Sequence, residues 1–97
     1  MRSIWENRQK VIAVYRLEIS HIAHHQLRRL PAQIQERVNG AIARLADNPR
    51  PPGVKKLTAR EGYRVRVGDY RVLYWVADDA KAVIIYRVMG RGDVYRA

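Results

Sequence analysis

The sequence lacks cysteine, has few acidic residues and contains no long apolar run. With no cysteine among 97 residues, a disulfide framework, thiol catalysis and a zinc site built on thiolates are all excluded. The apolar runs, such as residues 11–15 and 82–86, have the length of single strands, so no segment is expected to span a membrane. The first ten residues lack the uninterrupted apolar stretch of a secretory signal. These absences predict a cytoplasmic protein with no membrane partner.

Acidic residues are outnumbered by about two to one. Nineteen Lys and Arg against nine Asp and Glu give a net charge of +10 and a pI near 10.7. An excess of this size predicts a polyanionic partner. The charge is not confined to one end, because residues 1–50 hold nine basic and four acidic side chains and residues 51–97 hold ten and five. The question is therefore which charges meet on the folded surface.

The pattern of residues predicts a single domain of 11–97 after an N-terminal extension of 1–10. A hydrophobic fraction of 47% is enough for a core and excludes a wholly disordered chain. Alternation predicts a strand over 11–19, and Ser20 is a plausible N-cap for a helix through Leu30. After Pro31, apolar residues at three- and four-residue intervals predict a second helix that ends before Asn48. The expected inward positions of the two helices are Ile22, Ala23, Leu27 and Leu30, and then Ile34, Val38, Ala41, Ile42 and Leu45.

The rest of the chain has the pattern of strands. Short strands are predicted over 54–57, 63–67, 70–76 and 82–89, with a two-residue turn at Gly68 and Asp69 and a four-residue turn over 78–81. Glycine suits the first turn because primed hairpin turns need a positive φ. The predicted order is one strand, two helices and then three or four strands. The predicted fold class is α+β, a mostly antiparallel twisted sheet packed against an N-terminal helical hairpin.

A tight turn at Gly68 and Asp69 fixes which residues face each other across the hairpin. It places Tyr63, Val65, Val67, Tyr70, Val72 and Tyr74 on one apolar face, suited to packing under the helices. The opposite face then carries Arg64, Arg66, Arg71, Leu73 and Trp75. Arg66 lies directly across from Arg71 there, and like charges in that position are destabilising.

Two interpretations of these arginines compete. For any one of them, the solvated side of a half-exposed strand is the simpler explanation. For the set, phosphate binding is favoured, because six basic and only two acidic residues lie between Lys55 and Arg71 and guanidinium groups bind phosphate in a bidentate way. Lys55, Lys56 and Arg60 lie just upstream of this face and are the nucleic-acid-binding residues expected there. Those of the aromatic residues Tyr63, Trp75, Tyr86 and Tyr95 that stay exposed are suited to stacking on bases.

The C-terminal half of the chain, together with the helical hairpin, resembles a known family. The stretches GYRVRVGDYRVLYWV (62–76) and VIIYRVMGRGDVYR (83–96) are similar to the RelE/ParE toxin superfamily, and within it to the RelE-type mRNA interferases of type II toxin-antitoxin systems. The helical hairpin joined at Leu30 and Pro31 fits as well, so the resemblance covers nearly all of 11–96. It implies a RelE-like fold.

The resemblance also implies an activity and a set of site residues. RelE-type enzymes cleave messenger RNA in the ribosomal A site by attack of a ribose 2′-hydroxyl on the adjacent phosphate, without a metal or other cofactor. The residues that match the family's catalytic positions are Arg64, Arg66, Arg71, Arg91 and Tyr95. The implied partners are ribosome-bound mRNA and a RelB-like antitoxin with an acidic segment. ParE-like members share the fold but inhibit DNA gyrase, which is the alternative function.

One departure from the family pattern concerns the general base. Well-known members have lysines where this chain has Arg64 and Arg66, and an arginine cannot give up its proton as a lysine with a lowered pKa can. The candidates are Tyr95, Tyr63, Glu61 or no protein base at all, with catalysis by positioning and electrostatic stabilisation.

The histidines offer a second, weaker candidate site. His21 and His25 are four residues apart on the predicted first helix, with His24 between them, but no cysteine and only Glu18 lie nearby. An exposed polar helix face is the favoured interpretation, and no metal site is predicted.

Overall fold

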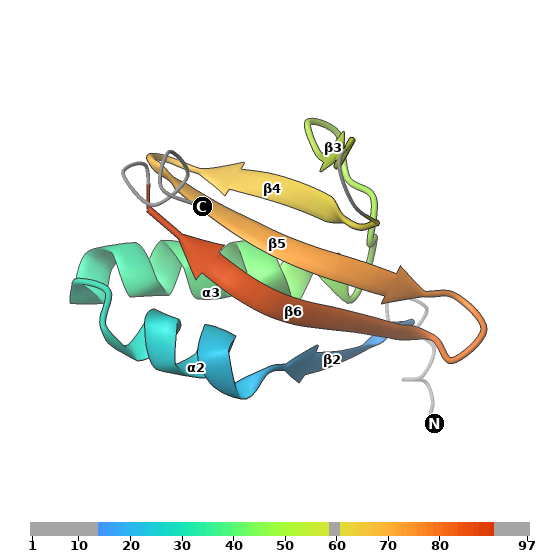
Figure 1. Cartoon of the computed structure of the whole chain (residues 1–97), viewed down its shortest axis with the longest axis horizontal. Helices are drawn as coiled ribbons and strands as arrows, with labels where there is room; N and C mark the ends of the chain where they lie inside the picture. The colour runs from blue at the N-terminus through green and yellow to red at the C-terminus, as the bar shows by residue number, and fades with distance from the viewer. Residues whose placement is uncertain (1–13, 59–60, 91–97) are drawn as a thin grey trace, which may run out of the picture.

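The computed structural model describes residues 14–58 and 61–90 of the chain as a five-stranded sheet with two helices (Figure 1). In chain order the elements are β2 (Arg16–Ile19), α2 (His21–Arg28), α3 (Ala32–Leu45), β3 (Lys55–Lys56), β4 (Tyr63–Val67), β5 (Tyr70–Ala77) and β6 (Ala82–Met89). The predicted α+β class and element order are confirmed. Residues 1–13, which include the predicted extension and the start of the predicted first strand, and residues 91–97 lie outside the described part.

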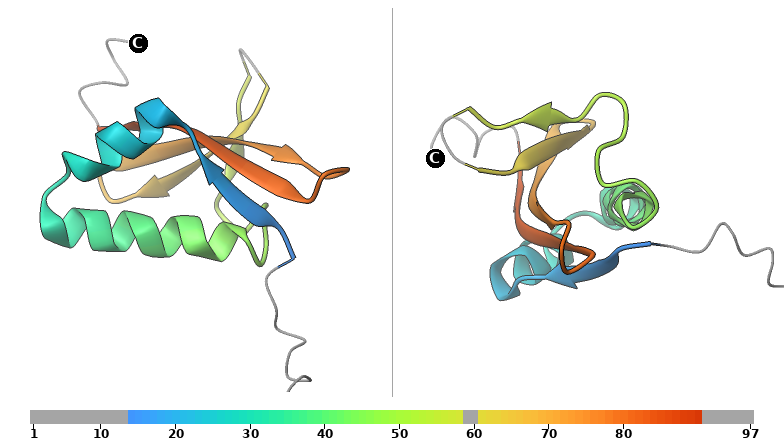
Figure 2. Two further views of the ribbon diagram at one scale, coloured as in Figure 1. Left: turned by 90° about the horizontal axis from the view of Figure 1, so that it is seen from below. Right: turned by 90° about the vertical axis from the view of Figure 1, so that its right-hand side faces the viewer.

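The sheet is mixed, with strand order β2-β6-β5-β4-β3. The four C-terminal strands pair antiparallel with their neighbours, whereas β2 pairs parallel with β6. A parallel pair needs a long crossover, which here contains both helices. The sheet curls around α3, which lies along its concave side, while α2 lies against β6 (Figure 2).

The helices begin where the sequence predicts. The Ser20 hydroxyl accepts a hydrogen bond from the Ala23 amide at 3.1 Å, so Ser20 is the N-cap of α2. This helix ends two residues before the predicted Leu30, in a tight turn closed by hydrogen bonds from Arg29 and Leu30 to carbonyls three residues back. The residue before a proline disfavours helical geometry, which explains the early end. Neither described helix is long and apolar enough to cross a membrane.

The core lies between the helices and the concave face of the sheet. Its buried members are Ala23, Leu27, Val38, Ile42, Leu45, Val72, Tyr74, Val83, Ile85 and Val88. The predicted inward positions are confirmed except for Ile22, which is exposed. The short helix α2 buries only Ala23 and Leu27, one residue on each of its two turns. Tyr74 is fully buried, and its hydroxyl donates a hydrogen bond to the Pro49 carbonyl at 2.7 Å.

The strand predictions differ from the structure mainly at strand ends. The predicted strands 63–67 and 82–89 match, 70–76 extends by one residue, and 54–57 shortens to two. Of the predicted strand over 11–19, the described part is β2 from Arg16; before it, the amides of Val14 and Tyr15 both donate to the Ala46 carbonyl. Gly68 has a φ of +61°, as the predicted primed turn requires.

Candidate functional site: an arginine face on the sheet

Three arginines and a lysine come together on the convex face of β3, β4 and β5. The predicted register is confirmed, with Arg66 opposite Arg71 and Arg64 opposite Leu73. On the other side of β4, Lys55 of β3 is the direct partner of Arg64. Two pairs of like charge therefore face each other on adjacent strands, an arrangement that lowers stability. Arg87 of β6, which is paired with Leu73, lies on the same side, and we call the set Lys55, Arg64, Arg66, Arg71 and Arg87 the arginine face.

A small hollow marks the centre of this face. Its volume is about 90 Å³, and it is lined by Lys55, Arg64, Arg66 and Arg71 together with Gly53. The four side chains come from three strands, so the sheet itself fixes their spacing. A hollow with four cationic walls and no acidic one suits a single phosphate group.

The charges on the arginine face have no carboxylate to balance them among the described residues. The two ion pairs found in that part of the chain, Arg16 with Glu18 and Arg50 with Asp78, lie elsewhere. Arg66 donates a hydrogen bond from Nε to the Gly68 carbonyl at 3.2 Å, which orients its guanidinium without neutralising it. The face therefore keeps its positive potential for an external anion.

A β-bulge adds a fifth basic residue that strict alternation along β6 would not place there. Leu73 pairs with Arg87 and Tyr74 pairs with Ile85, so Tyr86 is an extra residue on β6. A bulge of this kind turns two successive side chains to the same side of the sheet. Tyr86 and Arg87 thus both lie on the convex face. Arg87 is partly buried, and its Nε finds no hydrogen-bond acceptor within residues 14–58 and 61–90.

The other predicted site residues are distributed as follows. Lys56 is the partner of Tyr63 and so lies on the opposite side of β3 from Lys55. Tyr63, one of the candidate bases, packs against the core, and its hydroxyl accepts a hydrogen bond from Arg50 at 3.0 Å. Glu61 is exposed, two residues before β4 begins. Arg60, Arg91 and Tyr95 lie outside the described residues.

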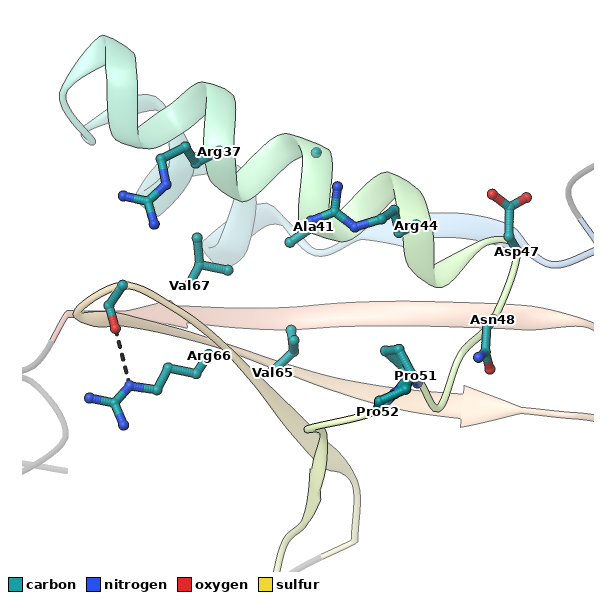
Figure 3. Close-up of a pocket in the computed structure, with 12 residues that line it drawn as sticks. Arg37, Ala41, Arg44, Asp47, Asn48, Pro51, Pro52, Val65, Arg66 and Val67 are labelled. Carbon is teal, nitrogen blue, oxygen red and sulfur yellow. Dashed lines mark hydrogen bonds between the residues drawn. The ribbon is translucent and has the colours of Figure 1, made fainter.

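A larger groove runs between α3 and β4 (Figure 3). Its volume is about 670 Å³. Figure 3 shows Val65 and Val67 pointing from β4 toward the helix, where they form an apolar floor. Arg37 and Arg44 rise from α3, and Arg66 links the groove to the arginine face. Asp47 is the acidic residue in this lining, so the groove is also basic.

At the far end of the sheet, a polar network joins the residue before β2, the loop after α3 and the turn between β5 and β6. The Arg50 guanidinium contacts the Asp78 carboxylate at 2.9 Å, and the Tyr15 hydroxyl donates to the same carboxylate at 2.7 Å. The hydrogen bonds from Arg50 and then Tyr15 hold the pKa of Asp78 below its ordinary value. These charges satisfy one another, which is typical of a structural network.

The described residues hold no cluster of three or more His, Asp or Glu side chains suited to a metal ion. His21, His24 and His25 are exposed on α2. They therefore remain the exposed helix face that the sequence favours.

Comparison with known proteins places this geometry in a family. Residues 8–95 match the family model described as the ParE toxin of the type II toxin-antitoxin system parDE. No curated protein sequence matches the chain.

Solved structures of RelE-type toxins are similar to this chain in fold. The toxin-antitoxin complex RelBE2 from Mycobacterium tuberculosis is 31% identical, with a TM-score of 0.69 over 79% of this chain and 98% of that one. The archaeal RelE-RelB complex from Pyrococcus horikoshii is 29% identical, with a TM-score of 0.70 over 81% and 97%. The isolated RelE toxin of E. coli shares the fold, with 23% identity and a TM-score of 0.70 over 84% and 92%. The chain is a type II toxin of the RelE/ParE superfamily and belongs to the ParE toxin family.

Proposed function

We propose that this toxin is a ribosome-dependent endoribonuclease that cleaves mRNA in the A site, without a metal ion, and so inhibits translation in the cytoplasm. The observation that supports this most is the hollow lined by Lys55, Arg64, Arg66 and Arg71. The sheet holds two like-charge pairs around it, Lys55 with Arg64 and Arg66 with Arg71. A fold selected for stability alone has no reason to keep them, whereas a bound phosphate would turn both into favourable contacts.

The proposed reaction is an internal transfer at phosphorus. The ribose 2′-oxygen attacks the adjacent phosphorus, the bond from phosphorus to the 5′-oxygen breaks, and a 2′,3′-cyclic phosphate forms. The proton lost by the 2′-hydroxyl is balanced by one gained at the leaving 5′-oxygen. In this scheme Arg71 holds the scissile phosphate, while Arg64 and Arg66 stabilise the charge that develops on its oxygens.

The roles of two further residues rest on the family pattern. Arg91 would stabilise the transition state, and Tyr95 would stack on or orient the base. With arginines at 64 and 66, electrostatic stabilisation and positioning carry the proposed reaction. Tyr63 is a poor candidate for the base, since its ring packs against the core on the opposite side of the sheet from the arginine face.

A RelB-like antitoxin is the proposed protein partner. Two of the similar structures above are complexes of a RelE-type toxin with its antitoxin. The basic groove between α3 and β4 suits an acidic, amphipathic segment, because apolar side chains would meet Val65 and Val67 while carboxylates meet Arg37 and Arg44. We expect the affinity for the antitoxin to fall as salt is added; a salt-independent affinity would contradict this mode of binding.

The alternative function is inhibition of DNA gyrase without nuclease activity. The observation that favours it is the family model itself, whose description is the ParE toxin. A gyrase inhibitor acts through protein contacts and has no need of a phosphate site on its sheet.

Primer extension on a ribosome-loaded message, after induced expression, separates the two functions. We expect cuts within codons in the A site, and an Arg71→Ala variant to lose about 10² to 10³ in rate because one preorganised donor is gone. Arg29→Ala, which removes an exposed arginine at the end of α2, is the matched control and should cleave normally. Unchanged cleavage by Arg71→Ala would refute the assigned site. Inhibited supercoiling with no cleavage by the wild-type toxin would establish the alternative.

A further inference from the structure

The convex face of the sheet carries an exposed aromatic side chain beyond the arginine cluster. Trp75 is 46% exposed, while the other large exposed hydrophobic residues described, Val14, Ile19 and Ile22, are aliphatic and belong to β2, α2 or the chain leading into them. Along β5, Arg71, Leu73 and Trp75 share the convex face by alternation. The indole therefore lies on the same surface as the proposed phosphate site.

Three contacts hold the indole in place. Its Nε1 donates a hydrogen bond to the Glu61 carbonyl at 3.2 Å. Its ring stacks on Tyr86 with 4.7 Å between ring centroids and 30° between planes. Gly62 leaves the space that the indole needs, because a Cβ at that position would come within 3.0 Å of Trp75 Cδ1. An exposed tryptophan that is fixed on several sides has already lost much of its rotamer freedom, so a ligand stacking on it pays little further entropy.

The position of Trp75 suits a nucleic acid better than a protein partner. It lies four positions after Arg71 on β5, which corresponds to roughly 13 Å along the strand, within reach of a few nucleotides of single strand. A hollow of about 250 Å³ beside the indole is also lined by Lys56, by Glu61 and by Arg50, whose guanidinium is paired with Asp78. An aromatic surface in line with the unbalanced cations of the arginine face is the arrangement by which proteins bind single-stranded nucleic acid.

We infer that Trp75, supported by Tyr86, is a stacking platform for a base of the bound RNA, a few nucleotides away from the phosphate held by Arg71. This inference rests on the proposed function in taking single-stranded RNA as the ligand. The bulge on β6 is part of the platform, since it turns Tyr86 to the convex face against the indole. Trp75 is a substrate-positioning residue in this scheme and takes no part in the bond changes.

The test is a binding titration that distinguishes contacts with the bases of RNA from contacts with its phosphates. The probe is a short 2′-O-methyl RNA oligonucleotide, which the proposed reaction cannot cleave, and a second oligonucleotide of the same length with abasic sites. A Trp5→Phe background leaves Trp75 as the one tryptophan, so its fluorescence reports directly on stacking. We expect quenching by the intact oligonucleotide and little by the abasic one.

Variants then measure the size of the effect. Trp75→Ala should weaken binding of the intact oligonucleotide by roughly 5- to 100-fold and leave binding of the abasic one nearly unchanged. Trp75→Phe should recover most of the loss. Ile22→Ala removes an equally exposed apolar side chain from α2 and should change neither. Thermal unfolding of each variant checks that the fold is retained.

The outcomes separate this inference from the proposed function. Equal affinities of wild type and Trp75→Ala for the intact oligonucleotide overturn the platform, even if ribosomes show normal cleavage. If Trp75→Ala instead loses antitoxin binding or self-association, the surface is a protein interface and the platform is again overturned. Quenching by intact RNA together with no cleavage on ribosomes overturns the proposed reaction and leaves the platform standing.

Discussion

Replacing Arg66 by glutamine should make the toxin more resistant to heat while weakening its proposed cleavage of RNA. Arg66 is exposed on β4 and lies directly opposite Arg71 of β5. Its hydrogen bond to the Gly68 carbonyl lies at the surface, where water can replace it. The substitution therefore removes a repulsion from the folded state and little that stabilises it.

The size of the gain follows from cross-strand energetics. Directly opposed pairs contribute roughly 0.2–1 kcal/mol, so the loss of one like-charge pair should raise the free energy of unfolding by about 0.5 kcal/mol. For a domain of this size, that corresponds to an increase in Tm of roughly 2–4 °C. Adding Arg71→Gln should give a smaller second increase, because the partner charge has already gone.

Thermal unfolding followed by circular dichroism tests this, at about 0.01 M salt and again near 1 M, where the Debye length falls from roughly 30 Å to about 3 Å. The gain should be clear at low salt and nearly vanish at high salt. Lys56→Gln is the matched control, because Lys56 faces Tyr63 instead of a cation. A gain of equal size in the control, or one that persists at high salt, would show that opposed charge is not the cause.

Three further predictions concern stability. Burial raises the pKa of Tyr74 to about 12, so the free energy of unfolding should fall as the pH rises from about 10 toward 12. In alkaline urea titrations, Tyr74→Phe should lose that pH dependence. The same variant should cost about 1–3 kcal/mol of stability, because the Pro49 carbonyl loses its hydrogen-bond donor. The pKa of Asp78 is lowered, so the stability that its ionised carboxylate contributes is complete above pH ~4 and is lost on acidification. Asp78→Asn should flatten the acid side of a plot of unfolding free energy against pH. Gly62→Ala should destabilise far more than Gly53→Ala. Both have positive φ, but only at Gly62 would a Cβ meet a backbone oxygen, at 2.8 Å, and equal Tm losses would contradict this.

The sequence predicted the part of the site that a single hairpin defines. Gly68 and Asp69 fix the turn, the turn fixes the register, and the register places Arg66 against Arg71. Period-two alternation then separates the apolar face from the basic face without any knowledge of the rest of the fold. The site could be found this far because every contact involved lies within about ten residues of chain.

Features that depend on a third strand were not predictable in the same way. The partnership of Lys55 with Arg64 needs β3 to pair with β4 in a register that no tight turn signal marks in the sequence, and the position of Arg87 needs the bulge on β6. A bulge changes the period of a strand through its pairing with a neighbour and leaves no local mark in the sequence. The inward position expected of Ile22 was wrong for a related reason, since α2 is short and its contact with β6 decides which side is covered.

The sequence by itself determined the element order, the hairpin register and the excess of positive charge, because each follows from local spacing or from simple counting. Only the tertiary structure decided that the unbalanced cations surround one hollow, that β2 joins β6 in parallel, and that an indole is fixed beside the site by Glu61, Gly62 and Tyr86. Those arrangements depend on how β2, β3 and β6 pair with their neighbours in the sheet, which local spacing in the sequence does not set.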